Sequence, residues 1–172
     1  ETLLSHTVKR LLKSTRFQQV VVAVARDDQR WLELSILSDV RVNVVIGGAE
    51  RAESVLAGLL ALTEAGDDDW VVVHDAARPC LRGSSLRAML DALADDPVGG
   101  IMAVPVADTL KQADSEGKII TTVDRSTVWA AQTPQVFRAP LIRRAYAAAR
   151  RARATVTDDA AAVERLGRRV TI

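Results

Sequence analysis

The residues best suited to chemistry are Asp75 and Arg78, which lie three positions apart in the segment HDAARP (74–79). This segment directly follows the apolar run WVVV (70–73), a predicted strand. A carboxylate there offers the hard oxygen ligands that suit Mg²⁺, and a nearby arginine can bind a phosphate through two parallel hydrogen bonds. The pattern favours a metal and polyphosphate site, but a helix cap for Asp75 and a surface ion pair for Arg78 explain it equally well.

A second candidate is the segment GGAERAES (47–54), between a predicted strand and a predicted helix. Its glycines let the backbone approach a ligand closely, and the start of the helix offers free N–H groups to an anion or a base edge. Ser54 adds a hydroxyl within reach. The spacing matches neither a Walker loop nor a dinucleotide fingerprint, and a tight turn is the simpler explanation.

Three further polar segments have simple structural explanations. Asp108-Thr109 and Thr122–Arg125 lie on the two limbs of a predicted hairpin, where Arg125 could pair with Asp124. Gln132–Gln135 resembles a turn that contains proline, and Thr157–Asp159 would cap a helix. A projecting hairpin has exposed edges, and a second subunit is the simplest cover for them.

Composition excludes several classes of protein. The chain has 172 residues and a formal charge of +1, which argues against partners bound through bulk charge, such as duplex DNA or an anionic membrane. Aromatic residues make up only 3%, too few for stacking single-stranded nucleic acid. Two histidines and one cysteine argue against a zinc site. Because Cys80 has no partner within the chain and the first residues lack a signal-peptide pattern, we expect a cytoplasmic protein.

The elements that must position these residues alternate between strand and helix. Strands are predicted at 19–25, 42–46, 70–73 and 101–106, and a hairpin at 109–113 and 118–123. Helices are predicted at 2–13, 27–37, 51–62 and 84–93, the last capped by Ser84-Ser85, and two more begin at Pro140 and after Thr157. This order predicts one α/β domain over 1–172, with a mostly parallel sheet, helices on both faces and a β-arm at 105–127. Ligands of such sheets bind at the carboxyl ends of the strands.

Taken together, six segments resemble the 2-C-methyl-D-erythritol 4-phosphate cytidylyltransferase family of the nonmevalonate isoprenoid pathway. They occur in the family's order: GGAERAESVLAGL (47–59), VHDAARP (73–79), VPVADTLK (104–111), TVDR (122–125), QTPQ (132–135) and TVTDD (155–159). The resemblance implies a Rossmann-like nucleotidyltransferase fold. It also implies a reaction in which CTP and methylerythritol phosphate give CDP-methylerythritol and pyrophosphate. Cytidylyltransferases that act on ribitol 5-phosphate share several of these segments and remain an alternative.

The resemblance also implies roles for individual residues. Asp75 would hold Mg²⁺ (or Mn²⁺), and Arg78 would lie beside the sugar-alcohol phosphate. A group of small residues would contact the nucleotide: Gly48, Ala49, Ser54 and Ala76. Arg51 would brace the glycine loop. Thr109 and the catalytic Arg125 would reach from the arm into the neighbouring subunit's site in a homodimer, while Thr133 and Thr157 would line the substrate side.

The sequence is also compatible with two other classes of protein. A phosphoacceptor signalling domain also places an aspartate at a strand end, here Asp75, and Asp27-Asp28 could supply its acidic pair. The hairpin and the QTPQ segment, however, have no place in that scheme. A non-catalytic dimerisation fragment is the other class, because the family's glycine-rich loop would precede Glu1 and a phosphate-binding lysine would follow Ile172. If these residues were the entire molecule, we would expect little turnover.

Overall fold

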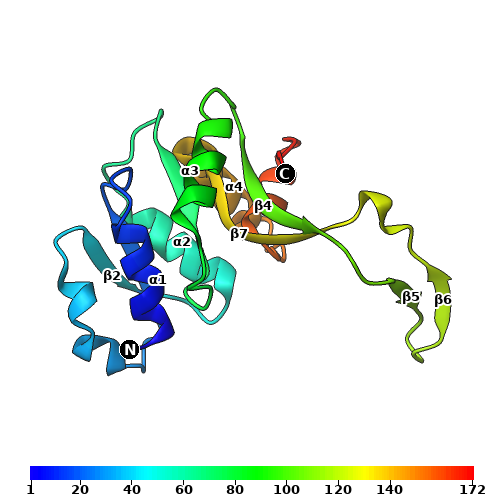
Figure 1. Ribbon diagram of the computed structural model, residues 1–172, viewed down its shortest axis with the longest axis horizontal. Coiled ribbons are helices and arrows are strands. Elements are labelled where there is room, and N and C mark those ends of the chain that lie inside the picture. Colours follow the sequence, from blue (N-terminus) through cyan, green and yellow to red (C-terminus); the bar gives the residue numbers. More distant parts are fainter.

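The computed structural model describes residues 1–172, and it is an α/β structure whose body contains two sheets instead of one (Figure 1). β1 (Val20–Val24) and β2 (Val42–Ile46) pair in parallel. β3 (Trp70–Val73), β7 (Trp129–Arg138) and β4 (Gly99–Pro105) form the other sheet, in that order. Both of its ladders are antiparallel, because β7 lies between β3 and β4 and runs against both. The predicted parallel pairing is therefore found between β1 and β2 only.

Five α-helices surround the strands, close to where the sequence predicts them. Their bounds are α1 (Leu3–Leu12), α2 (Arg51–Ala61), α3 (Gly83–Ala92), α4 (Ala139–Arg151) and α5 (Asp159–Glu164). No helix combines the length and the apolar character that a membrane crossing requires.

The helix predicted at 27–37 is wrong. The segment forms two short 3₁₀ helices, η1 (Arg30–Glu33) and η2 (Ser35–Ser38), separated by Leu34 in an extended conformation. The carboxylate of Asp28 accepts hydrogen bonds from the backbone and the side chain of Arg30. Such local side-chain bonds compete with α-helix formation, which the apolar spacing alone does not reveal.

Two predicted helix caps are also wrong. Arg82 stands at the N-cap of α3, so Ser84 and Ser85 lie inside its first turn. Asp158, not Thr157, caps α5, and its Oδ1 accepts from the backbone N–H of Ala161 at 2.8 Å. A carboxylate is favoured at this end of a helix because it bonds to free N–H groups and opposes the positive end of the dipole.

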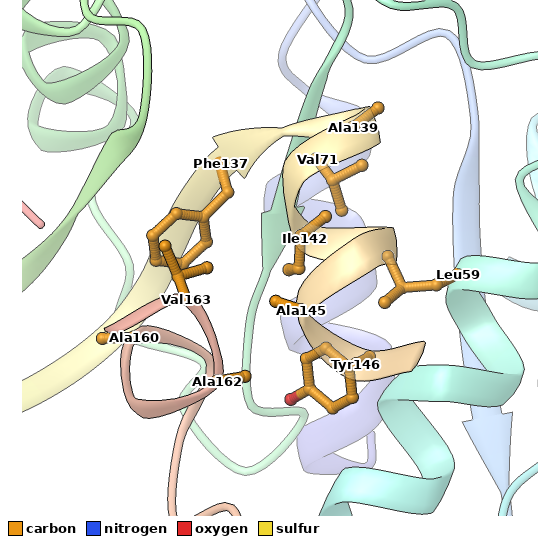
Figure 2. Packing of buried hydrophobic residues seen from close by; sticks show 10 residues of the cluster. All are labelled: Leu59, Val71, Phe137, Ala139, Ile142, Ala145, Tyr146, Ala160, Ala162 and Val163. Carbon is orange, nitrogen blue, oxygen red and sulfur yellow. The ribbon is translucent and has the colours of Figure 1, made fainter. Parts of the chain in front are cut away.

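The main hydrophobic cluster ties β3 to the elements around it (Figure 2). Phe137 of β7 and Ile142 of α4 have no exposed surface, and they pack with residues of α2, β3 and α5. A smaller cluster joins α1, β1 and η2. A cavity of about 700 Å³ is lined by residues of both β1 and β3, and its lining includes Arg51, His74 and Asp75.

A separate hairpin projects from the body at the far ends of β4 and β7 (Figure 1). It consists of β5 (Lys111–Ala113) and β6 (Ile119–Thr122), which pair antiparallel to each other and to no other strand. Every residue of both strands is exposed, including Ile119 and Ile120, which are 65% and 61% exposed.

Candidate active site

Asp75 lies just beyond the end of β3, with both carboxylate oxygens bonded to guanidinium groups. Its Oδ1 accepts from Nε of Arg51 at 3.3 Å, and its Oδ2 accepts from Nε of Arg78 at 2.9 Å. The backbone N–H of Arg78 also donates to the Asp75 carbonyl, which closes a tight turn between them. Asp75 and Arg78 therefore lie together beside the cavity, and the helix-cap explanation of Asp75 is wrong, since α3 starts only at Gly83.

The segment Gln132–Gln135 lies inside β7 and bonds to the residues that follow β3. The prediction of an irregular turn there is wrong, because pairing on both sides holds the segment in the sheet: Gln135 lies opposite both Val73 and Ile101. Gln132 accepts a hydrogen bond from Nη1 of Arg78, and Thr133 Oγ1 accepts from the backbone N–H of Asp75 at 3.2 Å. Thr133 thus fixes the site's backbone.

His74 is a further fixed part of this turn. Its Nε2 lies 2.9 Å from the carbonyl oxygen of Arg78, which can only accept, so Nε2 carries the proton. Its Nδ1 then accepts from the hydroxyl of Thr133, 3.0 Å away. Burial lowers the pKa of His74, which favours the neutral ring that this arrangement requires. His74 is partly buried, and its ring connects β7 to Arg78.

The sequence does not predict the contact between Arg51 and Asp159. Arg51 stands at the start of α2, and its guanidinium bonds to Asp75 and Asp159 instead of bracing the glycine loop. Asp159 has no exposed surface, and its Oδ2 lies 2.7 Å from Nη2 of Arg51. The carboxylate of Asp158 is bonded to Nε2 of Gln135 at 2.9 Å, which attaches the start of α5 to β7. No local pattern could reveal the Arg51–Asp159 pair, because the two residues are 108 positions apart.

The glycine loop that precedes α2 is closely packed under the first turn of that helix. A Cβ atom at Gly48 would come within 2.2 Å of Cβ of Glu53, and one at Gly47 within 2.5 Å of Oγ of Ser54, so both positions require glycine. Ser54 Oγ accepts from the backbone N–H of Gly48, and Glu53 accepts from that of Ala49. Ser54 and Glu53 therefore both hold the conformation of the loop.

Of the other predicted site residues, Ala76 adjoins this cluster, whereas Thr157, Thr109 and Arg125 make no polar contact with Asp75. Ala76 is next to Asp75, with its carbonyl bonded to the hydroxyl of Thr7 at 2.7 Å. Thr157 is exposed before α5. Thr109 and Arg125 are exposed at the base of the hairpin, where Nη1 of Arg125 donates to the carbonyl of Ala107. Neither shares a hydrogen bond or ion pair with Asp75 in its own chain.

Asp28, the other acidic candidate, pairs with Arg30 and not with Asp75. The acidic group that a phosphoacceptor domain needs is therefore not assembled around Asp75.

The donor set of the site fits one kind of metal centre. No three residues among His, Cys, Asp and Glu cluster closely enough to enclose a metal ion. Mg²⁺ is commonly held by one or two carboxylates together with substrate phosphates and water, so Asp75 alone is sufficient if a polyphosphate binds beside it. The side chain of Arg78 is 44% exposed beside Asp75, where its guanidinium could also bind a phosphate of such a ligand.

Comparison with known proteins agrees with this chemistry. The whole chain, residues 1–172, matches the family model described as 2-C-methyl-D-erythritol 4-phosphate cytidylyltransferase. A relative of that name from Pseudomonas putida (strain F1) is 51% identical over 166 residues, which are 95% of this chain and 71% of the relative. One from Pseudomonas entomophila is 49% identical over 169 residues, covering 97% of this chain and 72% of the relative.

Solved structures show the same likeness. The crystal structure of the Francisella tularensis 2-C-methyl-D-erythritol 4-phosphate cytidylyltransferase superposes with a TM-score of 0.88 at 30% identity, covering 99% of this chain and 77% of that one. A 4-diphosphocytidyl-2C-methyl-D-erythritol synthase superposes with a TM-score of 0.86 at 41% identity, covering 99% of this chain and 79% of that one.

Proposed function

This chain belongs to the 2-C-methyl-D-erythritol 4-phosphate cytidylyltransferase family, and we propose that it carries out the family's reaction beside the end of β3. A phosphate oxygen of methylerythritol phosphate attacks the α-phosphorus of CTP. The bond from that phosphorus to the bridging oxygen of the β-phosphate breaks, and pyrophosphate leaves. The observation that supports this proposal is the position of Asp75, held between Arg51 and Arg78 at a cavity of about 700 Å³.

The charges of this group suit a phosphoryl transfer, in which catalysis depends on positioning and on stabilising negative charge. Asp75 would hold Mg²⁺, which neutralises phosphate charge when bound. Arg78 is the most exposed of the three paired groups, and we assign it to the acceptor phosphate. Thr133, which fixes the Asp75 backbone, keeps the carboxylate at the strand end. It lies on the substrate side, and Thr157 is proposed to join it there.

The glycine loop is proposed to bind the cytosine. Gly48 and Ala49 lie at an exposed surface. Their N–H groups are bonded to Ser54 and Glu53, so we assign the contacts with cytosine to their carbonyl oxygens. Ala76 follows Asp75 directly and, like Ala49, has only a methyl side chain, which leaves room for a nucleotide. The turn between β3 and α3 and the loop before α2 would then hold the phosphates and the base respectively.

The hairpin is proposed to pack on a second copy of the chain. A two-stranded hairpin is marginally stable alone, and here two isoleucines on β6 are exposed. Covering them with a partner subunit would stabilise a homodimer and would bring Thr109 and Arg125 towards the partner's site. The single exposed thiol of Cys80 suits a reducing compartment, and we place the enzyme in the cytoplasm.

Pyrophosphate release tests the proposed reaction. Full-length protein is incubated with CTP and Mg²⁺, and either methylerythritol phosphate or ribitol 5-phosphate is added as the acceptor. We expect release to depend on methylerythritol phosphate and to be at least about tenfold slower with ribitol phosphate. Ribitol phosphate carries an additional hydroxyl, and a site shaped for methylerythritol phosphate would bury that hydroxyl without a hydrogen-bond partner. Equal rates with both acceptors would contradict the substrate assignment, and no release with either would contradict the reaction.

A further inference from the structure

A buried carboxylate that the proposed reaction does not use shares the guanidinium of Arg51 with Asp75. Asp159, the first residue of α5, has no exposed surface and accepts three hydrogen bonds. Nη2 of Arg51 donates to its Oδ2 at 2.7 Å, while Nη1 of Arg51 and the Tyr146 hydroxyl donate to its Oδ1 at 3.3 and 2.5 Å. Figure 2 shows the Tyr146 hydroxyl turned towards α5 from within the main cluster. A buried charge persists only when it is paired and hydrogen-bonded in this way.

Arg51 divides its donors unequally between two carboxylates. Both terminal nitrogens face Asp159, and only Nε contacts Asp75, at 3.3 Å. Burial on its own would lower the pKa of Arg51, but the hydrogen bonds and charge of Asp159 more than offset it and raise the pKa. Arg51 therefore remains charged, and its stronger interaction is with Asp159.

The sharing of Arg51 between the two carboxylates determines whether the oxygens of Asp75 remain available to a cation. Arginine binds a lone carboxylate most strongly through two parallel N–H···O bonds, which occupy both of its oxygens. Asp75 faces two guanidinium groups, so without Asp159 it would be the only carboxylate in contact with Arg51. A guanidinium bound through two nitrogens would then compete directly with a cation for the Asp75 oxygens.

We propose that Asp159 is a positioning residue that holds the terminal nitrogens of Arg51 away from Asp75 and so keeps this carboxylate available to a divalent cation. The inference rests on the proposed function in one respect, the assignment of the cation to Asp75. Asp159 does not touch the cation. It acts through Arg51, and Tyr146 fixes its orientation.

Titration of the full-length protein with Mn²⁺, in the presence of an equimolar amount of CTP and without an acceptor phosphate, tests the proposal without turnover. Binding is followed by the loss of the free-ion electron paramagnetic resonance signal relative to CTP alone. We expect Asp159→Asn to weaken Mn²⁺ binding by about tenfold, the effect typical of residues that orient a metal ligand. The side chain of Arg51 is 35% exposed, so its charge stays solvated and the variant is expected to fold. The double variant Arg51→Gln/Asp159→Asn should regain near-parental affinity, because the competing guanidinium is gone.

Asp158→Asn is the matched control. Asp158 precedes Asp159 in sequence and bonds to Gln135 and Ala161, but it does not contact Arg51. This variant alters the same helix start, and we expect it to bind Mn²⁺ like the parent protein.

Four outcomes would overturn the inference. The first is parental Mn²⁺ affinity in a folded Asp159→Asn variant. The second is a double variant that binds Mn²⁺ as weakly as Asp159→Asn does, which would indicate that Asp159 has a purely structural role. If Asp159→Asn does not fold, Arg51→Lys is measured in its place. The single ammonium group of the lysine must pair with the buried Asp159 and release Asp75, so we expect Mn²⁺ binding at least as strong as in the parent. Weaker Mn²⁺ binding by Arg51→Lys is the third outcome. The fourth is undiminished binding by Asp75→Asn, which would also overturn the proposed metal site, whereas the first two leave that site intact.

Discussion

Asp75→Asn should lower kcat/KM for cytidylyl transfer by about 10³-fold, a loss of about 4 kcal/mol of transition-state stabilisation. The amide keeps the size of the side chain but removes its charge and one acceptor oxygen. A cation would then lose its only carboxylate ligand, and the guanidinium groups of Arg51 and Arg78 would lose a shared counter-charge. Initial rates of pyrophosphate release over a range of CTP concentrations measure the effect.

Asp91→Asn provides the control for this prediction. Asp91 on α3 also pairs with an arginine, Arg16, at 2.6 Å, but both side chains are about half exposed or more, and Asp91 does not line the cavity beside Asp75. Exposed pairs contribute little, so this variant should keep parental activity. A folded Asp75→Asn variant that retains more than about a tenth of the parental kcat/KM would contradict the assigned role. Losing a charge–charge contact at a reacting phosphate should lower kcat/KM by more than about tenfold.

Arg125→Ala should inactivate the enzyme through the partner subunit's site. Within its own chain Arg125 bonds to Ala107 at the base of the projecting hairpin (Figure 1), and it has no polar contact with the Asp75 cluster. Its contribution to a site therefore requires a second copy of the chain. Arg125→Ala and Asp75→Ala homodimers should each be nearly inactive, and after equal mixing and subunit exchange about a quarter of the parental activity should return, because half of the dimers then hold one intact site of two.

Activity after mixing is compared with that of each variant alone, and exchange is verified by mass spectrometry of differently tagged subunits. Glu116→Gln serves as a control on the same hairpin, since Glu116 is exposed and pairs only with Lys118. If exchange is complete and no activity returns, Arg125 does not act across the dimer.

Local sequence patterns predicted the strands well where these are short and strongly apolar. β1, β2 and β3 are runs of valine and other β-branched residues, and they lie at the positions expected from these runs. The placement of HDAARP at a strand end followed from the same patterns, so Asp75 and Arg78 could be predicted together. The structure brings their side chains into hydrogen-bonding contact, because only two residues separate them along the chain.

The features that the sequence did not reveal depend on contacts between distant segments. β7 contains glutamines and a proline, which have weak strand preference, and it forms a strand because β3 and β4 pair with it on both sides. Its central position also makes the sheet antiparallel. The burial of Asp159 depends on Arg51 and Tyr146, which come from two other helices, whereas the sequence around Asp159 predicts only a capped helix start.

The most direct test of the account is a crystal of the full-length protein soaked with CTP and Mn²⁺, with data collected at the manganese absorption edge. The account predicts an anomalous peak within coordination distance of a carboxylate oxygen of Asp75, about 2.2 Å, with the triphosphate beside it and the cytosine at the loop that contains Gly48. A nucleotide bound elsewhere, or a manganese ion held by other residues while Asp75 stays paired with both Arg51 and Arg78, would contradict it.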